Sequence, residues 1–318
     1  MDIRPDQAIS AEINEILIRA QLSLEMILMI KSSLNADSKT GELYKWAHLT
    51  LLSFECVSGV NEVALPGAIA MEFFALAADI FDDIQDQDND ELPWRKIPNA
   101  NAINLATCLL MLGYEALSTI SDCGLLKEVH TILNRTGICA SDGQFQEFLY
   151  DASEKVTLEQ YFELVKKKSG SLTTCACKIG AILGGASESV VFQLGQFGTN
   201  LGIMSQIRND LNDFLNFEKK NDFVYNRKTL PYVYLLSILK GETADRFKEL
   251  TQMDGQGLNK FGNKEQEYLK HLAFDEGVIH YCSVMYEVFR QKSLKIIKAI
   301  PVLEKCKGKL IKLVEESV

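Results

Sequence analysis

The chain has 318 residues, enough to bury a large core in one big domain or in two ordinary ones. Its 47% hydrophobic and 24% charged residues are typical of a globular protein and exclude a largely disordered one. The formal charge of −10 at pH 7 argues against nucleic acid as a general partner.

The chain shows no sequence signal for export or membrane insertion. Its eight cysteines lack the spacing of a disulfide framework, so we expect reduced thiols. The N-terminal segment MDIRPDQAIS is polar and unlike a signal peptide. No uncharged apolar stretch reaches the roughly 18 residues that span a bilayer. These features favour a cytoplasmic protein without stable membrane insertion.

Apolar residues recur at steps of three and four through most of the chain, which is the period of amphipathic helices. One stripe near the N-terminus contains Ile13, Ile16, Leu17, Ala20, Leu24 and Ile27, and one near the C-terminus contains Met285, Phe289, Ile296 and Ile300. Turns are expected at 38–41, 58–61, 93–101, 122–124, 151–156 and 184–188. The sequence therefore predicts an all-α, single-domain bundle of roughly ten to thirteen helices over residues 1–318.

The first segment with distinctive chemistry is DIFDDIQDQDND at 79–90, which holds six aspartates and follows the apolar stretch 68–78. On a helix, one stripe would contain Asp79, Asp83, Asp86 and Asp90, with Asp82 beside it. Like charges one turn apart repel each other, and aspartate is a poor helix former. The simplest interpretation is a solvated acidic helix end. An acidic stripe on a mostly buried helix instead favours a hard divalent cation such as Mg²⁺.

A second patch of oxygen ligands lies in GIMSQIRNDLNDF at 202–214. On a helix, one face would contain Gln206, Asn209, Asp210 and Asp213. Two such patches on long helices of one bundle suggest facing walls of a cavity that holds several Mg²⁺ ions. A diphosphate is the natural guest, because metal ions convert the repulsion between anions into coordination.

Two basic segments could supply cations for the same phosphates. Lys166, Lys167 and Lys168 precede a Ser-Gly-Ser turn at 169–171, where a helix start would also offer N–H donors to an anion. The segment RKTLP at 227–231 repeats this combination after the second acidic patch. Each segment taken singly could be a solvated loop, so the phosphate hypothesis depends on the four segments together.

Five motifs follow one another in the order DDIQD at 82–86, GQFQE at 143–147, KSGSL at 168–172, SQIRNDLND at 205–213 and KTLP at 228–231. Their order and spacing resemble those of the trans-isoprenyl diphosphate synthases, the polyprenyl synthetase family. The resemblance covers about residues 40–240. It implies an isoprenoid-synthase helical bundle around a deep central cavity, in an enzyme that is commonly a homodimer.

The resemblance also implies a role for each motif in binding Mg²⁺ and an allylic isoprenyl diphosphate. About three Mg²⁺ ions would be held by Asp82, Asp83 and Asp86, with Asp88 as a further candidate, and by Asp210 with Gln206, Asn209 and Asp213. Lys168 and Lys228 would grip the diphosphate, and Gln144 would point toward the metal ions or the nascent cation. The metal ions and lysines would stabilise the departing diphosphate, so that the allylic C–O bond ionises.

The length of the prenyl chain should depend on residues one and two turns before Asp82. Ala77 and Ala78 are small, while Phe73 and Phe74 lie one turn further from the motif. We expect this floor to admit a chain of farnesyl or geranylgeranyl length, and Phe74 to limit it.

The chain departs from the family where the acceptor should bind. Elongating members bind isopentenyl diphosphate with a Gly-Lys-Arg segment and with an Arg-Arg pair after the first aspartate motif. Here Lys45 is the strong cation near the first segment, and Pro93-Trp94 followed by Arg95-Lys96 replaces the pair. Losing these cations should weaken the binding of a second diphosphate. The pattern is most similar to the ComQ-type transferases, which prenylate a tryptophan of a pheromone precursor peptide in quorum sensing.

Three alternatives stay open. A short-chain prenyl diphosphate synthase could use Lys45, Arg95 and Lys96 as substitute cations. A class I terpene cyclase would carry a serine or threonine and a glutamate where this chain has Asp213 and Phe217, which argues against it. An inactive partner subunit would keep the fold and lose ligands that are intact here. The basic C-terminal helices, about 276–316, could cover the cavity or contact a peptide, but a solvated face is the simplest interpretation.

Overall fold

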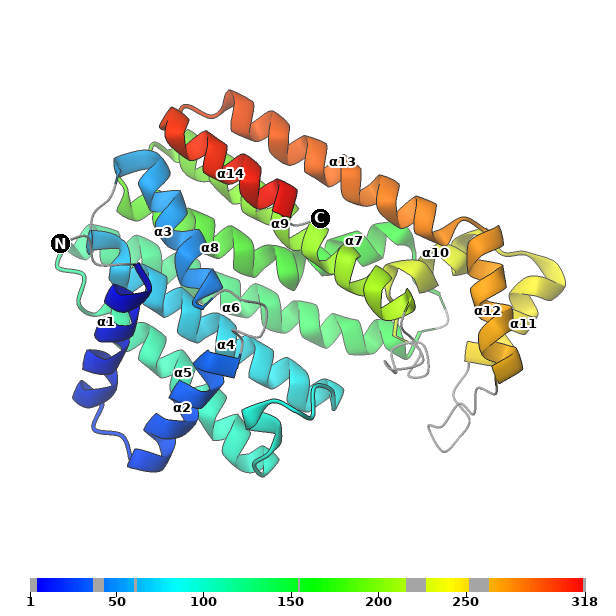
Figure 1. Ribbon diagram of the computed structural model, residues 1–318, viewed down its shortest axis with the longest axis horizontal. Coiled ribbons are helices and arrows are strands. Elements are labelled where there is room, and N and C mark those ends of the chain that lie inside the picture. Colours follow the sequence, from blue (N-terminus) through cyan, green and yellow to red (C-terminus); the bar gives the residue numbers. More distant parts are fainter. Residues whose placement is uncertain are drawn as a thin grey trace. The chain divides into compact units, whose positions relative to one another are not determined.

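The computed structural model describes residues 5–36, 43–59, 62–153, 155–215, 227–251 and 263–316. Within these ranges all regular structure is helical, with fourteen α-helices and no strand (Figure 1). The prediction of an all-α fold is therefore confirmed. The expected turn at 38–41 and Phe217 lie outside the described residues.

The chain divides into two compact units that each draw on several segments. Unit 1 comprises residues 1–137, 172–198 and 296–311, and unit 2 comprises 138–171, 199–295 and 312–318. Unit 1 contains α1 (Pro5–Arg19), α2 (Leu24–Ala36), α3 (Lys45–Ser58), α4 (Leu65–Asp86) and α5 (Asn99–Leu117). Unit 2 contains α7 (Leu158–Lys167), α10 (Leu230–Ile238), α11 (Gly241–Thr251) and α12 (Asn263–Asp275). A single domain over 1–318 stays a prediction.

Five further helices supply residues to both units. They are α6 (Cys123–Asp151), α8 (Ser169–Leu183), α9 (Glu188–Leu215), α13 (Val278–Ala299) and α14 (Glu304–Glu316). Short 3₁₀ turns η2 (Glu62–Ala64) and η3 (Pro93–Arg95) precede α4 and α5.

The described residues form one helix more than the upper end of the expected range, and the predicted N-terminal stripe is divided between two helices. The helix breaks after Arg19, where Gln21 adopts a left-handed conformation with φ of 50°. Ser23 then opens α2 by accepting a hydrogen bond from the Met26 N–H at 3.3 Å. The expectation of one stripe through Leu24 was therefore wrong, since a serine cap overrides the apolar period there.

The core of unit 1 is built around α4, which packs against α5 and α3 (Figure 1). Thirteen of its 22 residues are buried, as expected for a helix that is apolar on nearly all sides. The buried Glu72 carboxylate accepts the N–H groups of Trp46 at 3.0 Å and Ala47 at 2.9 Å, and so caps the start of α3. The position of α4 therefore also fixes the first turn of α3.

By length and hydropathy, α5 is the one helix among the described residues that could cross a membrane. It buries eight residues against the core of unit 1. Such burial is typical of the core helix of a globular protein.

Unit 2 is held by aromatic contacts that converge on α7, α10 and α13. The rings of Phe162 and Phe289 lie 5.7 Å apart between α7 and α13. Tyr234 and Tyr281 stack at 4.2 Å between α10 and α13. The start of α7 is fixed by a capping box of Thr157 and Gln160. These contacts position the segments that carry the second polar cluster.

Part of the basic C-terminal region is paired within unit 1. Lys305 and Lys309 reach the carboxylate of Glu55 on α3 at 3.3 Å and 2.6 Å. The Leu303 N–H donates to the carbonyl of Cys56 at 3.0 Å. The first part of α14 is therefore attached to α3 and does not form only a solvated face.

We expect Gly180→Ala to destabilise the protein, because Gly180 is where α8 approaches α3 most closely. An added Cβ would lie 2.8 Å from the Phe54 nitrogen and closer still to the Thr50 carbonyl oxygen. The free energy of unfolding in urea should fall by about 3 kcal/mol. The matched control is Gly308→Ala in α14, where a Cβ meets nothing within 4 Å and should add about 0.5–1 kcal/mol. Equal stability of the two variants would contradict this packing.

Candidate active site

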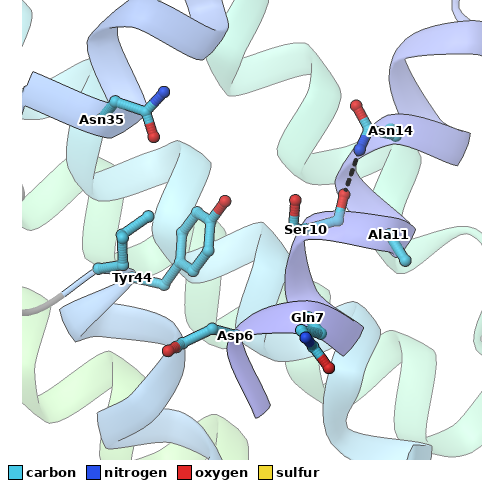
Figure 2. Close-up of a pocket in the computed structure, with 8 residues that line it drawn as sticks. Asp6, Gln7, Ser10, Ala11, Asn14, Asn35 and Tyr44 are labelled. Carbon is cyan, nitrogen blue, oxygen red and sulfur yellow. Dashed lines mark hydrogen bonds between the residues drawn. The ribbon is translucent and has the colours of Figure 1, made fainter. Parts of the chain in front are cut away.

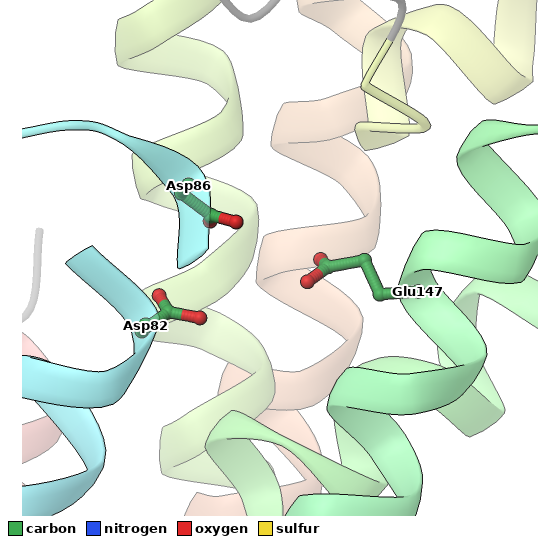
Figure 3. A group of neighbouring side chains, drawn as sticks. All are labelled: Asp82, Asp86 and Glu147. Atoms are coloured by element: carbon green, nitrogen blue, oxygen red, sulfur yellow. The ribbon is translucent and has the colours of Figure 1, made fainter. Parts of the chain in front are cut away.

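The predicted site residues fall into two polar clusters, one in each unit. The first is the end of α4, where Asp82 and Asp86 are both half-buried and lie one turn apart. A carboxylate oxygen of Asp82 and one of Asp86 lie within 4.8 Å of each other (Figure 3). Paired carboxylate oxygens are the donors that Mg²⁺ prefers, so these residues fit the ion that the sequence predicts.

Asp83 differs from Asp82 and Asp86 in being buried. Its carboxylate is 7% exposed and accepts two neutral donors, Trp94 Nε1 at 2.7 Å and Asn89 Nδ2 at 2.6 Å. Burial raises the pKa of Asp83, and the nearby charges of Asp82 and Asp88 also raise it, while the two donors lower it. A metal-binding role for Asp83 stays a prediction.

The chain leaves α4 through two residues in left-handed conformations, Gln87 and Asn89, each with φ of 55°. The N–H groups of Gln87 and Asp88 both donate to the Asp83 carbonyl, the latter at 3.2 Å. The helix therefore stops before Asp90, which pairs with Arg95 at 3.1 Å. The expected stripe through Asp90 was wrong, because the left-handed residues reverse the chain and bring Trp94 back to the helix.

The predicted chain floor lies on the buried part of α4. Phe73, Phe74 and Ala77 are buried, and Ala78 is half-buried. The tip of the Phe74 ring lies against Gly137 of α6, where an added Cβ would be 2.8 Å from its Cζ. Phe74 therefore fills its place only because position 137 has no side chain.

On the acceptor side, Lys45 is the first residue of α3 and is half-buried, with its Nζ 5.7 Å from the centre of the Trp46 ring. The N–H groups of the next two residues already donate to Glu72. A helix start with free N–H groups can bind a phosphate, but this one is occupied by a carboxylate of the chain itself.

The second cluster lies in unit 2 around Asp210, which is 3% exposed. Its carboxylate accepts Tyr161 Oη at 2.6 Å, Gln206 Nε2 at 2.7 Å and the Leu230 N–H at 2.7 Å. All three donors are neutral. Burial is the largest influence and raises the pKa of Asp210 to about 6, despite these hydrogen bonds.

Lys168 is the single residue between the end of α7 and the start of α8, and it forms an ion pair with Glu147 of the GQFQE motif. The next residue, Ser169, donates to Gln206 Oε1 at 2.7 Å. Gly143 of the same motif permits this approach, since an added Cβ would lie 3.1 Å from Lys168 Cγ. The motif residues therefore hold Lys168 beside a carboxylate.

The segment that carries Lys228 is fixed by Asp151, the last residue of α6. Asp151 accepts the Lys228 N–H and Arg227 Nη1, both at 3.0 Å. The Lys228 side chain is 6% exposed, with its Nζ 4.5 Å from the centre of the Tyr232 ring. Burial lowers the pKa of this lysine to about 8, with Asp151 acting in the opposite direction.

The remaining predicted ligands are distributed unevenly. Asn209, Asp210 and Asp213 all lie on the continuous helix α9, where Asn209 is exposed, Asp213 half-buried and Asp210 buried. Gln144 is half-buried, and its buried Nε2 has no hydrogen-bond partner among the residues that the structure describes. Asn209 is therefore open to solvent, whereas Asp210 is buried and surrounded by its three hydrogen-bond donors.

Sequence reasoning missed the side chains that hold the predicted ones in place. These are Trp94, Asn89, Tyr161, Asp151 and Glu147. The position of Trp94 at an expected arginine was a usable signal. Nothing local marks Tyr161 as a partner of Asp210, because the two residues lie 49 positions apart.

A polar pocket of about 500 Å³ lies elsewhere in unit 1, between α1, α2 and the start of α3 (Figure 2). Its lining includes Asp6, Ser10, Asn35 and Tyr44, and none of the predicted site residues is among the residues that line it. This pocket is therefore separate from the motifs that carry the predicted chemistry.

We expect Asp210→Asn to flatten the pH dependence of stability. Because the pKa of Asp210 is about 6 in the folded protein against 3.8 ordinarily, folding strengthens proton binding. This contribution to stability is complete below about pH 4 and is lost as the pH rises through about 6, on the order of 3 kcal/mol. Melting temperatures of metal-free protein from pH 4 to 7 should fall more steeply for the natural chain than for the variant. Parallel profiles would contradict the assignment.

Known proteins are similar to this chain over most of its length. A family model described as polyprenyl synthetase matches residues 46–267. The tryptophan prenyltransferase ComQ of Bacillus spizizenii is 28% identical over 249 residues, which cover 76% of this chain and 85% of that protein. A geranylgeranyl diphosphate synthase of Methanosarcina mazei is 29% identical over 241 residues, which cover 70% of this chain and 73% of that protein.

Solved structures agree on the fold. A decaprenyl diphosphate synthase from Rhodobacter capsulatus has a TM-score of 0.84 and 18% identity, and the match covers 98% of this chain and 94% of that one. The family model spans more than half of the chain and includes all five motifs. The chain therefore belongs to the polyprenyl synthetase family and is a prenyltransferase.

Proposed function

We propose that this prenyltransferase uses Mg²⁺ to ionise an allylic isoprenyl diphosphate, such as geranyl or farnesyl diphosphate. It then transfers the prenyl group to an acceptor without a diphosphate, a tryptophan of a pheromone precursor peptide. The observation that carries the proposal is Trp94. It lies buried and bound to Asp83 where an elongating enzyme should carry an arginine for its second diphosphate. The similarity to ComQ, named a tryptophan prenyltransferase, supports the same acceptor.

On the donor side, Asp82 and Asp86 are the first proposed metal ligands. Their paired carboxylates fit a hard divalent cation. The proposed set of metal ligands further includes Asp83, Asp88, Asn209, Asp210 and Asp213, with Gln206 beside them, for about three Mg²⁺ ions. When bound, Mg²⁺ neutralises the diphosphate and makes it a better leaving group. This assignment rests on the order of the motifs and on family membership.

Lys168 and Lys228 are proposed to bind the oxygens of the same diphosphate. The ion pair with Glu147 orients Lys168 until a phosphate takes the place of the carboxylate. Asp151 fixes the backbone of Lys228, whose buried position strengthens its attraction for an anion relative to a lysine in water. An incoming phosphate would raise the lowered pKa of Lys228 and hold its proton.

The allylic cation must be kept from water until the acceptor reaches it. The buried Phe73, Phe74 and Ala77 give the end of α4 an apolar wall, which offers no nucleophile. The amide side chain of Gln144 is proposed to point toward the metal ions or the allylic cation. The indole of a tryptophan is a good carbon nucleophile for such a cation and carries no charge.

The acceptor side offers little to a second diphosphate. Arg95 is paired with Asp90, and the start of α3 after Lys45 is occupied by Glu72. A diphosphate requires charge-assisted hydrogen bonds, each about twice as strong as a neutral one. A neutral acceptor avoids that requirement. We also propose a cytoplasmic location and a homodimer, in line with the sequence expectations.

A second candidate is a short-chain prenyl diphosphate synthase that condenses its donor with isopentenyl diphosphate. It is favoured by the cations Lys45, Arg95 and Lys96, which remain on the acceptor side. The 29% identity to a geranylgeranyl diphosphate synthase also favours it.

One incubation separates the two candidates. The protein with Mg²⁺ and farnesyl or geranyl diphosphate receives a tryptophan-containing precursor peptide in one tube and isopentenyl diphosphate in another. We expect a prenylated peptide in the first, measured by mass spectrometry, and no elongation in the second. Asp82→Ala should lower the rate at least about 100-fold. Asp245→Ala, an exposed aspartate on α11, is the control that should leave it unchanged. Product only with isopentenyl diphosphate would remove the peptide acceptor.

We expect Phe74→Ala to shift the preference of the enzyme toward a longer prenyl donor. Removing the phenyl ring that lies against Gly137 should open space for about one more isoprene unit of the prenyl chain. Competition between geranyl, farnesyl and geranylgeranyl diphosphate measures the shift. Phe192→Ala, an exposed phenylalanine of α9, is the control. Because a buried phenylalanine can cost about 3–5 kcal/mol, Phe74→Leu serves as a milder variant. An unchanged preference in both variants contradicts the assignment of Phe74.

A further inference from the structure

Trp94 is the buried centre of the segment that follows α4. Its side chain is 3% exposed in the short turn η3, and its Nε1 donates to Asp83 Oδ2 at 2.7 Å. A buried indole usually needs a partner for its N–H, and here the partner is the carboxylate of Asp83, the second residue of the DDIQD motif. The hydrogen bond therefore joins the segment after the helix to the proposed metal-binding turn.

The other oxygen of Asp83 is held from the same segment. Asn89 Nδ2 donates to Asp83 Oδ1 at 2.6 Å, and Asn89 itself has a left-handed φ of 55°. Asp83 thus receives one neutral donor on each oxygen. A carboxylate bound on both oxygens has a fixed side-chain rotamer, and with it the last turn of α4 is fixed.

The same turn carries Asp82 and Asp86, the first proposed metal ligands. Asp82 precedes Asp83 directly, and Asp86 lies one turn further on with an oxygen within 4.8 Å of one from Asp82. Both are attached to the helical backbone that Asp83 anchors. A shift of this turn would change the separation of the paired oxygens, and metal sites lose affinity when ligand geometry is relaxed.

We propose that Trp94 is a positioning residue for this metal site: through Asp83 it holds Asp82 and Asp86 at the spacing that binds Mg²⁺ with the diphosphate. The inference rests on the proposed function, because it takes Asp82 and Asp86 as ligands.

The neutrality of the indole has a second consequence. An arginine at this place would also donate to Asp83, but it would add a positive charge beside the acidic turn. Trp94 supplies the hydrogen bond and leaves the negative charge of the cluster intact for metal ions. One side chain therefore strengthens the donor site and itself supplies no positive charge to a second diphosphate.

The test is a calorimetric titration of Mg²⁺ into the full chain in the presence of inorganic pyrophosphate. The two tryptophans of the chain give a matched pair of variants, Trp94→Phe and Trp46→Phe. The Nε1 of Trp46 is buried without a hydrogen-bond partner among the described residues, so its loss removes no such contact. We expect Trp94→Phe to weaken Mg²⁺ binding about tenfold, the effect of one hydrogen bond to a charged group, and Trp46→Phe to stay within about twofold.

A spectroscopic readout accompanies the affinities. In the Trp46→Phe protein the remaining tryptophan is Trp94, bound to Asp83. Adding Mg²⁺ and pyrophosphate should shift its emission, whereas a tryptophan that only fills the core would not respond.

Asn89→Gly provides a second test should Trp94→Phe fold poorly by circular dichroism. Glycine tolerates the φ of 55° but cannot donate to Asp83, so Mg²⁺ binding should also weaken. If the natural chain itself binds no Mg²⁺ with pyrophosphate, the proposed function fails. If the natural chain binds Mg²⁺ but Trp94→Phe or Asn89→Gly binds it as tightly as Trp46→Phe does, the positioning role of Trp94 is overturned.

Discussion

The carboxyl end of a helix is the least favourable place for negative charge, because the helix dipole is already negative there. This chain nonetheless places Asp82, Asp83 and Asp86 in the last two turns of α4. The structure resolves part of this repulsion internally, since Asp83 receives neutral donors from Trp94 and Asn89. The half-buried pair Asp82 and Asp86 is then the part of the cluster that we propose a divalent cation stabilises. The proposed chemistry begins from this demand for a cation.

In unit 2, as at the end of α4, some carboxylates hold the backbone in place while other side chains are proposed to bind the ligand. Asp210 holds the start of α10 through the Leu230 N–H, and Asp151 holds Arg227 and Lys228 shortly before that helix. Lys228 is fixed between these two anchors, and Lys168 is oriented by Glu147. Asp151 and Asp210 therefore both hold the backbone on either side of Lys228. The cations, not these carboxylates, are the groups proposed to receive the phosphate oxygens.

Much of the fold followed from the sequence, because long apolar helices with short turns leave a strong period in the residue pattern. The break between α1 and α2 was missed, since the apolar stripe continues through it and only Ser23 marks the new helix. At the site, residue type and spacing identified the clusters but not the roles within them. Asp82 and Asp83 are identical and adjacent, yet Asp83 is buried because Trp94, 11 positions away, reaches it. Such partners come from tertiary packing, which no local pattern encodes.

The central claim is that the chain binds one diphosphate, that of the allylic donor. The most direct measurement is calorimetry of isopentenyl diphosphate added to protein already saturated with Mg²⁺ and inorganic pyrophosphate. We expect no measurable binding heat beyond dilution, because the neutral Trp94 stands where an arginine is expected and Arg95 is already paired with Asp90. Saturable binding of one isopentenyl diphosphate per chain would contradict it and identify a chain-elongating synthase.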